Sequence, residues 1–305
     1  MNDVRIPLGT VAEDILDFVI THVGFIFSAL REFFLAIYSA VDFVLSSPPF
    51  WVIIAVVALL GLLARGWVFA GGTAVALLLI VGVDQWANAM DSLSLILVAS
   101  AIAIILSIPL GIAAARSNVV SSIVRPVLDF MQTTPAFVYL IPALLLFRVG
   151  VVPGIIATVI FALAPGVRLT ELGIRGVDSE VVEAGQAFGA SQWRILRQIQ
   201  LPLALPTIMA GVNQVIMLSL SMVVIAGMVG AGGLGGDVVA SLNRIDIALG
   251  VEAGVSVVIL AIVLDRLTAS FGQKRGLFGG VSAWVRSRLA PSRKSDDARP
   301  VPNAG

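Results

Sequence analysis

The sequence has 305 residues, of which 58% are hydrophobic and only 12% are charged. Soluble domains average about 25% charged residues, so this composition excludes most water-soluble proteins and is typical of membrane proteins. Nineteen basic residues balance nineteen acidic ones, which leaves no net positive field to attract nucleic acid. The chain has no cysteine and one histidine, so we expect no metal site built from these residues.

Seven apolar runs approach or exceed the length needed to cross the hydrocarbon layer of a bilayer. They cover residues 50–64, 67–83, 93–115, 127–147, 151–167, 206–230 and 247–264. Only Arg65 and Gly66 separate the first two runs. One helix through both would be roughly 50 Å long with an arginine near its middle, so two helices and a tight turn are the better interpretation. The sequence therefore predicts an all-α polytopic protein with about seven transmembrane helices.

The distribution of lysine and arginine predicts the orientation of these helices. With seven spans, fifteen of the nineteen basic residues fall on one side of the membrane. The positive-inside rule assigns that side to the cytoplasm. We therefore expect the N-terminus outside and the C-terminus inside.

The two ends of the chain differ in character from the central part. Residues 1–49 mix acidic residues with apolar runs that are too short to span, which predicts an external amphipathic segment at the membrane interface. Residues 265–305 contain prolines and many charges, which predicts a flexible cytoplasmic tail. The transmembrane domain then covers residues 50–264.

The longest cytoplasmic connection in this topology covers residues 168–205. Its pattern predicts a short helix over 181–188, a turn at Gly189, and a second helix that Ser191 caps and Pro202 stops. A short helix-turn-helix below the membrane suits docking into a groove on a soluble partner.

One face of the second predicted helix is apolar. Trp193, Leu196 and Ile199 follow one another at helical spacing, so they share that face. Two interpretations remain open at this point. The stripe either docks on a partner protein or packs against the chain's own transmembrane helices.

The same connection carries a longer motif. It consists of Glu183, Ala184, Gly185, Gly189, Ile199, Leu201 and Pro202, at fixed spacing around Trp193. This motif resembles the EAA loop of permease subunits of ATP-binding-cassette (ABC) importers, with Gly185 where the family favours alanine. The resemblance implies that the loop forms the coupling helix that inserts into the ATPase subunit.

Further stretches narrow the resemblance. Residues 125–142, 205–235 and 259–268 are similar to glycine betaine/proline (osmoprotectant) permeases, and the similarity extends from about residue 50 to 268. It implies a type I importer bundle (MetI-like) in the bacterial inner membrane. It also implies a second permease copy, cytoplasmic ATPase subunits that bind ATP and Mg²⁺, and an external substrate-binding protein.

The sequence itself offers no ATP site. A Walker A loop ends in Gly-Lys followed by Ser or Thr, and neither lysine of the chain, Lys274 or Lys294, is preceded by a glycine. We therefore expect no catalytic residue and no resident cofactor in this chain.

Two groups of polar residues interrupt the apolar spans and are candidates for the substrate path. The first group is Asp129, Gln132, Thr133 and Thr134, and the second is Asn213, Gln214, Ser219 and Ser221. A carboxylate in the path would attract a quaternary ammonium group. Alternatively, Asp129 pairs with Arg125 at the membrane interface, and the second group bonds neighbouring helices.

The resulting prediction is a permease subunit that imports glycine betaine or a related quaternary amine or zwitterion, such as choline or proline. The main alternative is a stand-alone channel or secondary transporter for a small solute. A membrane-embedded enzyme is a third possibility, although the sequence offers no matched set of catalytic residues for it.

Overall fold

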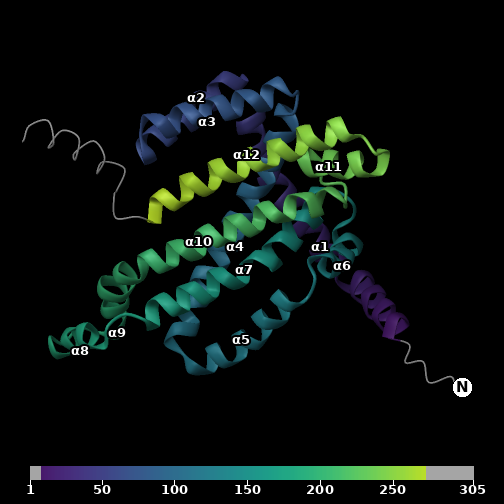
Figure 1. The fold of residues 1–305 in the computed structure, drawn as a ribbon. Coiled ribbons are helices and arrows are strands. Elements are labelled where there is room, and N and C mark those ends of the chain that lie inside the picture. The colour runs from purple at the N-terminus through teal and green to yellow at the C-terminus, as the bar shows by residue number, and fades with distance from the viewer. Residues whose placement is uncertain (1–7, 273–305) are drawn as a thin grey trace, which may run out of the picture.

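The computed structural model describes residues 8–272, and within this range the chain is almost entirely helical, with no strand (Figure 1). The helices of the first half are α1 (Leu8–Ser46), α2 (Phe50–Arg65), α3 (Trp67–Gly82), α4 (Trp86–Arg116), α5 (Asn118–Thr133) and α6 (Ala136–Phe147). The second half contains α7 (Val151–Arg175), α8 (Ser179–Ala187), α9 (Gln192–Ile195), the π-helical turn η1 (Leu196–Gln200), α10 (Leu201–Gly227), α11 (Gly233–Arg244) and α12 (Ile247–Gly272).

The prediction of an all-α polytopic protein is confirmed. Five of the described helices are long and apolar enough to cross a membrane, namely α1, α4, α7, the continuous run from α9 to α10, and α12. Helices α2 and α3 are shorter, with 16 residues each. They meet at Gly66, whose φ of 92° allows the tight turn that the sequence predicted.

The fourth predicted span, residues 127–147, is not one helix. Helices α5 and α6 meet at an angle of 97°, because Pro135 cannot continue the helix and holds Thr134 in an extended conformation. The hydroxyl of Tyr139 in α6 donates a hydrogen bond to the carbonyl of Met131 at 2.9 Å. This bond satisfies one of the carbonyl groups left free at the end of α5.

Helix α1 crosses the ends of α4, α6 and α7 (Figure 1). Phe34 and Tyr38 pack against a cluster that includes the first third of α4 and the start of α7, and Phe27 contacts the ring of Phe147 edge-on. Where the sequence suggested only short apolar runs, the helix is continuous over 39 residues. Its position at the outer interface stays a prediction.

The core of the bundle consists of α4, α7 and α10, and small residues allow these helices to pack closely. A Cβ atom on Gly166 of α7 would lie 2.4 Å from the hydroxyl of Ser107 in α4. A Cβ atom on Gly154 at the other end of α7 would lie 2.8 Å from the Cβ of Ala226 in α10. Close helix packing of this kind is common in membranes, where van der Waals contact replaces the hydrophobic effect between helices.

The C-terminal boundary predicted at residue 265 lies too early. Helix α12 continues to Gly272, so the first residues of the predicted flexible tail are helical. The rest of that predicted tail lies outside the described residues.

Candidate coupling site and substrate path

Helix α8 and the turn after it form as the sequence predicted. The side chain of Asp178 caps α8 by accepting a hydrogen bond from the backbone N–H of Glu180 at 2.9 Å. After α8, Gly189 has a φ of 75°, and the N–H of Ala190 donates back to the carbonyl of Gly185. The hydroxyl of Ser191 then caps α9 by accepting from the N–H of Arg194. These bonds define a compact helix-turn-helix at one end of the bundle (Figure 1).

The glycine at position 185 marks the point where α8 approaches η1. A Cβ atom there would lie 2.7 Å from Cδ1 of Ile199 and 3.6 Å from Cγ1 of Ile195. The missing methyl group therefore lets Ile199 pack against α8. The departure from alanine seen in the motif has a structural role in this chain.

The exposed surface of this region differs from the predicted stripe. Leu196 is only 1% exposed and packs with Ile174 and Ala204, at the ends of α7 and α10. Phe188, by contrast, is 92% exposed and Trp193 is 60% exposed. Packing on the chain's own helices is thus confirmed for Leu196, whereas docking of the exposed Trp193 on a partner stays a prediction.

Pro202 does not stop the second helix. The chain passes from α9 through η1 into α10 without a break, and the N–H of Leu201 donates to the carbonyl of Leu196, five residues back. Proline lacks the N–H for a regular helical bond, and the wider π-type turn just before it accommodates this loss. Helix α9, the turn η1 and α10 therefore form one continuous helical element.

The predicted connection is also shorter at its start. Helix α7 extends to Arg175 and includes Arg168, so the residues outside the long helices begin at Gly176. The motif therefore lies directly between the end of α7 and the beginning of α10.

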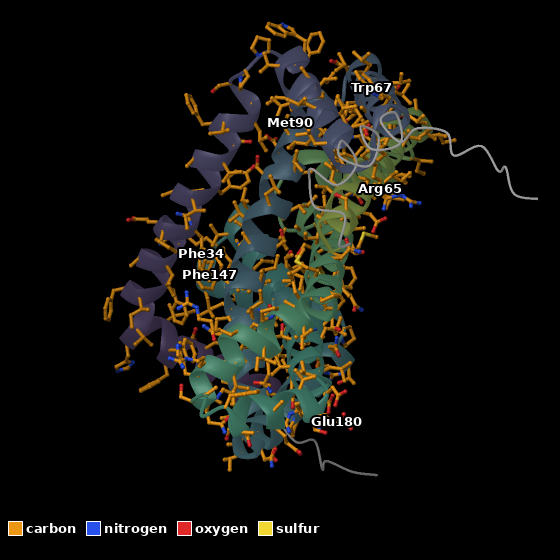
Figure 2. The ribbon with its side chains drawn as sticks, turned by 90° about the vertical axis from the view of Figure 1, so that its left-hand side faces the viewer. Phe34, Arg65, Trp67, Met90, Phe147 and Glu180 are labelled. Atoms are coloured by element: carbon orange, nitrogen blue, oxygen red, sulfur yellow. The ribbon has the colours of Figure 1, made fainter. Side chains whose placement is uncertain are left out.

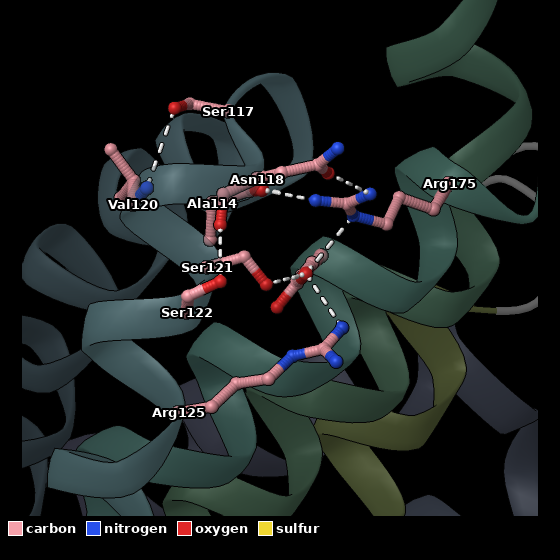
Figure 3. Close-up of polar contacts among 9 residues, drawn as sticks. Ala114, Ser117, Asn118, Val120, Ser121, Ser122, Arg125 and Arg175 are labelled. Atoms are coloured by element: carbon pink, nitrogen blue, oxygen red, sulfur yellow. Dashed lines mark hydrogen bonds and ion pairs between the residues drawn. The ribbon is translucent and has the colours of Figure 1, made fainter.

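A buried carboxylate joins the helices behind this region (Figure 3). Glu171 of α7 is 5% exposed, and one of its oxygens, Oε1, accepts bonds from Ser121 at 2.8 Å and from Arg125 at 2.9 Å, both in α5. The Nε atom of Arg175 lies 3.0 Å from the same oxygen. One oxygen of this buried carboxylate thus accepts from three donors, and such networks hold their partners in one arrangement.

Arg175 extends the same network to α4. Its guanidinium donates to the carbonyl of Ala114 at 2.8 Å and to the side-chain oxygen of Asn118 at 3.0 Å. The ends of α4, α5 and α7 are thus tied to one another beside α8. Sequence reasoning missed this cluster. The available signal was the spacing of Glu171 and Arg175, an acidic and a basic residue four positions apart.

The first group of predicted path residues lies at the end of α5, and its aspartate is paired differently from the prediction. Asp129 forms an ion pair with Arg168 of α7, while Arg125 binds Glu171. The hydroxyls of Thr133 and Thr134 donate to the carbonyl of Phe130 in their own helix. Gln132 is exposed.

The second group occupies α10 and splits into three kinds of environment. Asn213 donates to Asp265 and accepts from Thr268, both in α12, which fits the helix-bonding alternative. Ser219 and Ser221 donate to carbonyls of their own helix. Gln214 is exposed and forms no hydrogen bond within residues 8–272. The structure thus brings Asn213 into an interhelical contact and leaves Gln214 on the outer surface of the single chain.

At the opposite end of the bundle, the glycine-rich segment joins α10 to α11. A Cβ atom on Gly227 would lie 2.2 Å from the backbone of Gly235, so these two helices touch through their backbones. The N–H of Leu234 donates to the hydroxyl of Ser92 in α4, and Asn88 donates to Asp237 at 2.7 Å. Helix α10 ends at Gly227, directly before this segment.

Within the described residues there is no group of three or more His, Asp or Glu side chains arranged to hold a metal ion.

Comparisons with known proteins agree with this geometry. The family described as "Binding-protein-dependent transport system inner membrane component" matches residues 107–276. The glycine betaine/carnitine transport permease protein GbuB of Listeria monocytogenes is 45% identical over 273 residues, which cover 88% of this chain and 96% of the relative. The glycine betaine/proline betaine transport system permease protein ProW of Escherichia coli is 46% identical over 268 residues, covering 88% of this chain and 76% of the relative.

A solved structure shares the fold. A chain of the MetNI methionine ABC transporter in an inward-facing conformation superposes with a TM-score of 0.57 at 19% identity, covering 63% of this chain and 95% of that chain. The family match covers more than half of the sequence, and the close relatives span most of it. The chain therefore belongs to the family of binding-protein-dependent transport system inner membrane components, as a multi-pass permease subunit of an ABC importer in the inner membrane.

Proposed function

We propose that this permease imports glycine betaine or a related quaternary amine or zwitterion, such as choline or proline. The names of several relatives carry this proposal, since GbuB, ProW and the glycine betaine permease OpuAB of Bacillus subtilis, at 41% identity, are all glycine betaine permeases. More distant relatives transport carnitine or choline, which belong to the same chemical class.

ATP is hydrolysed by a separate cytoplasmic ATPase subunit, which also holds Mg²⁺. The exposed Phe188 and Trp193 support this assignment, because large apolar side chains on a short projecting helix suit insertion into a groove of a partner. The lack of a Walker A sequence in the chain agrees with it. The region that carries α8 is then cytoplasmic, and the opposite end of the bundle meets an external substrate-binding protein.

Transport proceeds by alternating access in a dimer of two copies of this chain. Exposed Gln214 in the middle of α10 supports a polar path between the copies, because an amide facing hydrocarbon would lose its hydrogen bonds. Closure of the ATPase moves α8 and α9, and the direct connection of α9 through η1 passes this movement to α10. The Glu171 network moves α4, α5 and α7 with it.

Uptake of labelled glycine betaine into vesicles tests the proposal. The vesicles contain this chain alone, with the ATPase, or with both the ATPase and the binding protein, and unlabelled choline and proline serve as competitors. We expect uptake only when ATP and both partners are present. Uptake by the chain alone would instead support a stand-alone channel or secondary transporter, and an assembled, ATP-hydrolysing complex that imports no betaine would refute the substrate.

A further inference from the structure

A groove between the α2–α3 hairpin and α12 has features that transport does not explain. It has a volume of about 540 Å³, and none of the polar groups on α5 and α10 lines it. Phe69, Ile259 and Ile262 contribute apolar walls, and Arg65 and Arg266 lie at its edge. Arg65 and Glu180 of α8 lie far apart (Figure 2), so the groove is separate from the coupling surface.

The charges at the groove are not balanced within the described residues. Arg65 is exposed and forms no ion pair or hydrogen bond within residues 8–272. Arg266 has only a distant contact with Asp265, at 3.9 Å, and Asp265 also accepts a hydrogen bond from Asn213 on α10. Two arginines and one aspartate leave the groove with a net positive charge.

The length of the hairpin places this charge where lipid head groups begin. Each of its helices has 16 residues and is about 24 Å long, less than the roughly 30 Å of the hydrocarbon layer. Arg65 at the tip of the hairpin therefore lies at or just within the edge of the apolar layer. A charge at that depth is costly unless an anion pairs with it.

A residue in the wall of the same groove holds a buried hydroxyl. Thr73 of α3 is 3% exposed, and its hydroxyl finds no partner in the described structure. A buried hydroxyl without a hydrogen bond is unfavourable, so this atom needs a partner that the isolated chain does not provide. Thr73 lies two helical turns deeper than Arg65, among the apolar walls.

We propose that the groove binds one anionic phospholipid from the surrounding bilayer. Its phosphate lies between Arg65 and Arg266, its chains lie along Phe69, Ile259 and Ile262, and an ester carbonyl accepts from Thr73. The net positive charge selects an anionic lipid, because a zwitterionic lipid would bring its own cation toward Arg65. The inference needs only that the chain is embedded in a membrane, and it is independent of the transported substrate.

Native mass spectrometry of the purified full-length chain in detergent tests this site. The chain is titrated with phosphatidylglycerol or phosphatidylcholine, and the fraction that retains one lipid is measured. We expect phosphatidylglycerol to bind more tightly than phosphatidylcholine. Arg65→Gln and Arg266→Gln should each weaken phosphatidylglycerol binding about fivefold, as expected for about 1 kcal/mol per arginine near the surface.

Control variants separate the groove from general charge and from misfolding. Arg116→Gln removes an exposed arginine at the end of α4, outside the groove, and should leave binding unchanged. Arg65→Lys keeps the charge and should retain most of the binding. Thr73→Val should weaken the binding of both lipids, because both carry ester carbonyls. Equal binding of the two lipids, an equal loss in Arg116→Gln, or no loss in the two groove variants would overturn the proposal.

Discussion

The turn at Gly189 gives the sharpest test of the coupling region. Its φ of 75° lies in the left-handed region, and a Cβ atom at this position would meet nothing within 4 Å. A substitution there therefore acts through the backbone conformation alone. A left-handed conformation costs an ordinary residue about 1–2 kcal/mol, and a β-branched residue such as valine tolerates it poorly.

This cost translates into a measurable loss. A free-energy difference of about 1.4 kcal/mol changes an equilibrium constant tenfold. Gly189→Val should therefore make the native turn about 5–30-fold less favourable relative to other conformations. We expect the variant to reach the membrane in normal amounts, because Gly189 contributes nothing to the packed core. Uptake per ATP hydrolysed should fall by up to this factor, because only the native turn holds α8 in position.

The assay compares uptake and ATP hydrolysis in vesicles that contain the complete transporter. Gly189→Asn is the matched control, because asparagine adopts the left-handed conformation more readily than other residues and should keep most of the coupling. The reasoning would be refuted if Gly189→Val retained full coupled transport, or if the asparagine and valine variants lost activity equally.

Three further predictions concern contacts elsewhere in the chain. Glu171→Gln replaces a buried charge that binds two arginines, so it should destabilise the chain by about 1–3 kcal/mol and lower its melting temperature in detergent. The control Glu180→Gln, on exposed α8, should leave the melting temperature unchanged. Equal melting temperatures of the two variants would contradict this prediction. Gly227→Ala should also lower the melting temperature, by an amount equivalent to about 1–3 kcal/mol, because the added methyl group meets the backbone of Gly235. The control Gly254→Ala adds a methyl group in open space and should leave the melting temperature unchanged. If Gly227→Ala also left it unchanged, α10 and α11 would not be in contact. Asp129→Asn breaks an exposed ion pair with Arg168, so the free energy of unfolding should change by less than about 1 kcal/mol. Uptake should stay within about twofold of that of the unsubstituted transporter. A much larger loss of uptake in an assembled complex would place Asp129 in the substrate path.

Local sequence patterns predicted the elements that local forces determine. The long apolar runs became α4, α7, α10 and α12, and the turn at Gly66 follows from its conformational freedom. The cap at Ser191 and the turn at Gly189 also depend only on nearby residues. These features could be read from spacing and residue type.

The features that were missed depend on contacts between distant segments. Arg125 was expected beside Asp129 on the same helix, but it binds Glu171, 46 residues away, which spacing along one helix cannot reveal. Spacing alone could not decide whether Leu196 docks on a partner or packs on the bundle, and its burial against Ile174 is a contact between distant segments. The passage of the helix through Pro202 required a π-helical turn that has no simple sequence signal.

The central claim is that α8 and its turn contact the ATPase subunit. Because the chain has no cysteine, a single one can be introduced at Phe188 and modified with a photoactivatable maleimide. Leu242→Cys, which replaces an exposed residue of α11, provides the matched control at the opposite end of the bundle. We predict that illumination of the assembled transporter links the chain to the ATPase from position 188 and not from position 242. The account would be contradicted if an active complex gave no ATPase crosslink from position 188, or gave equal crosslinking from both positions.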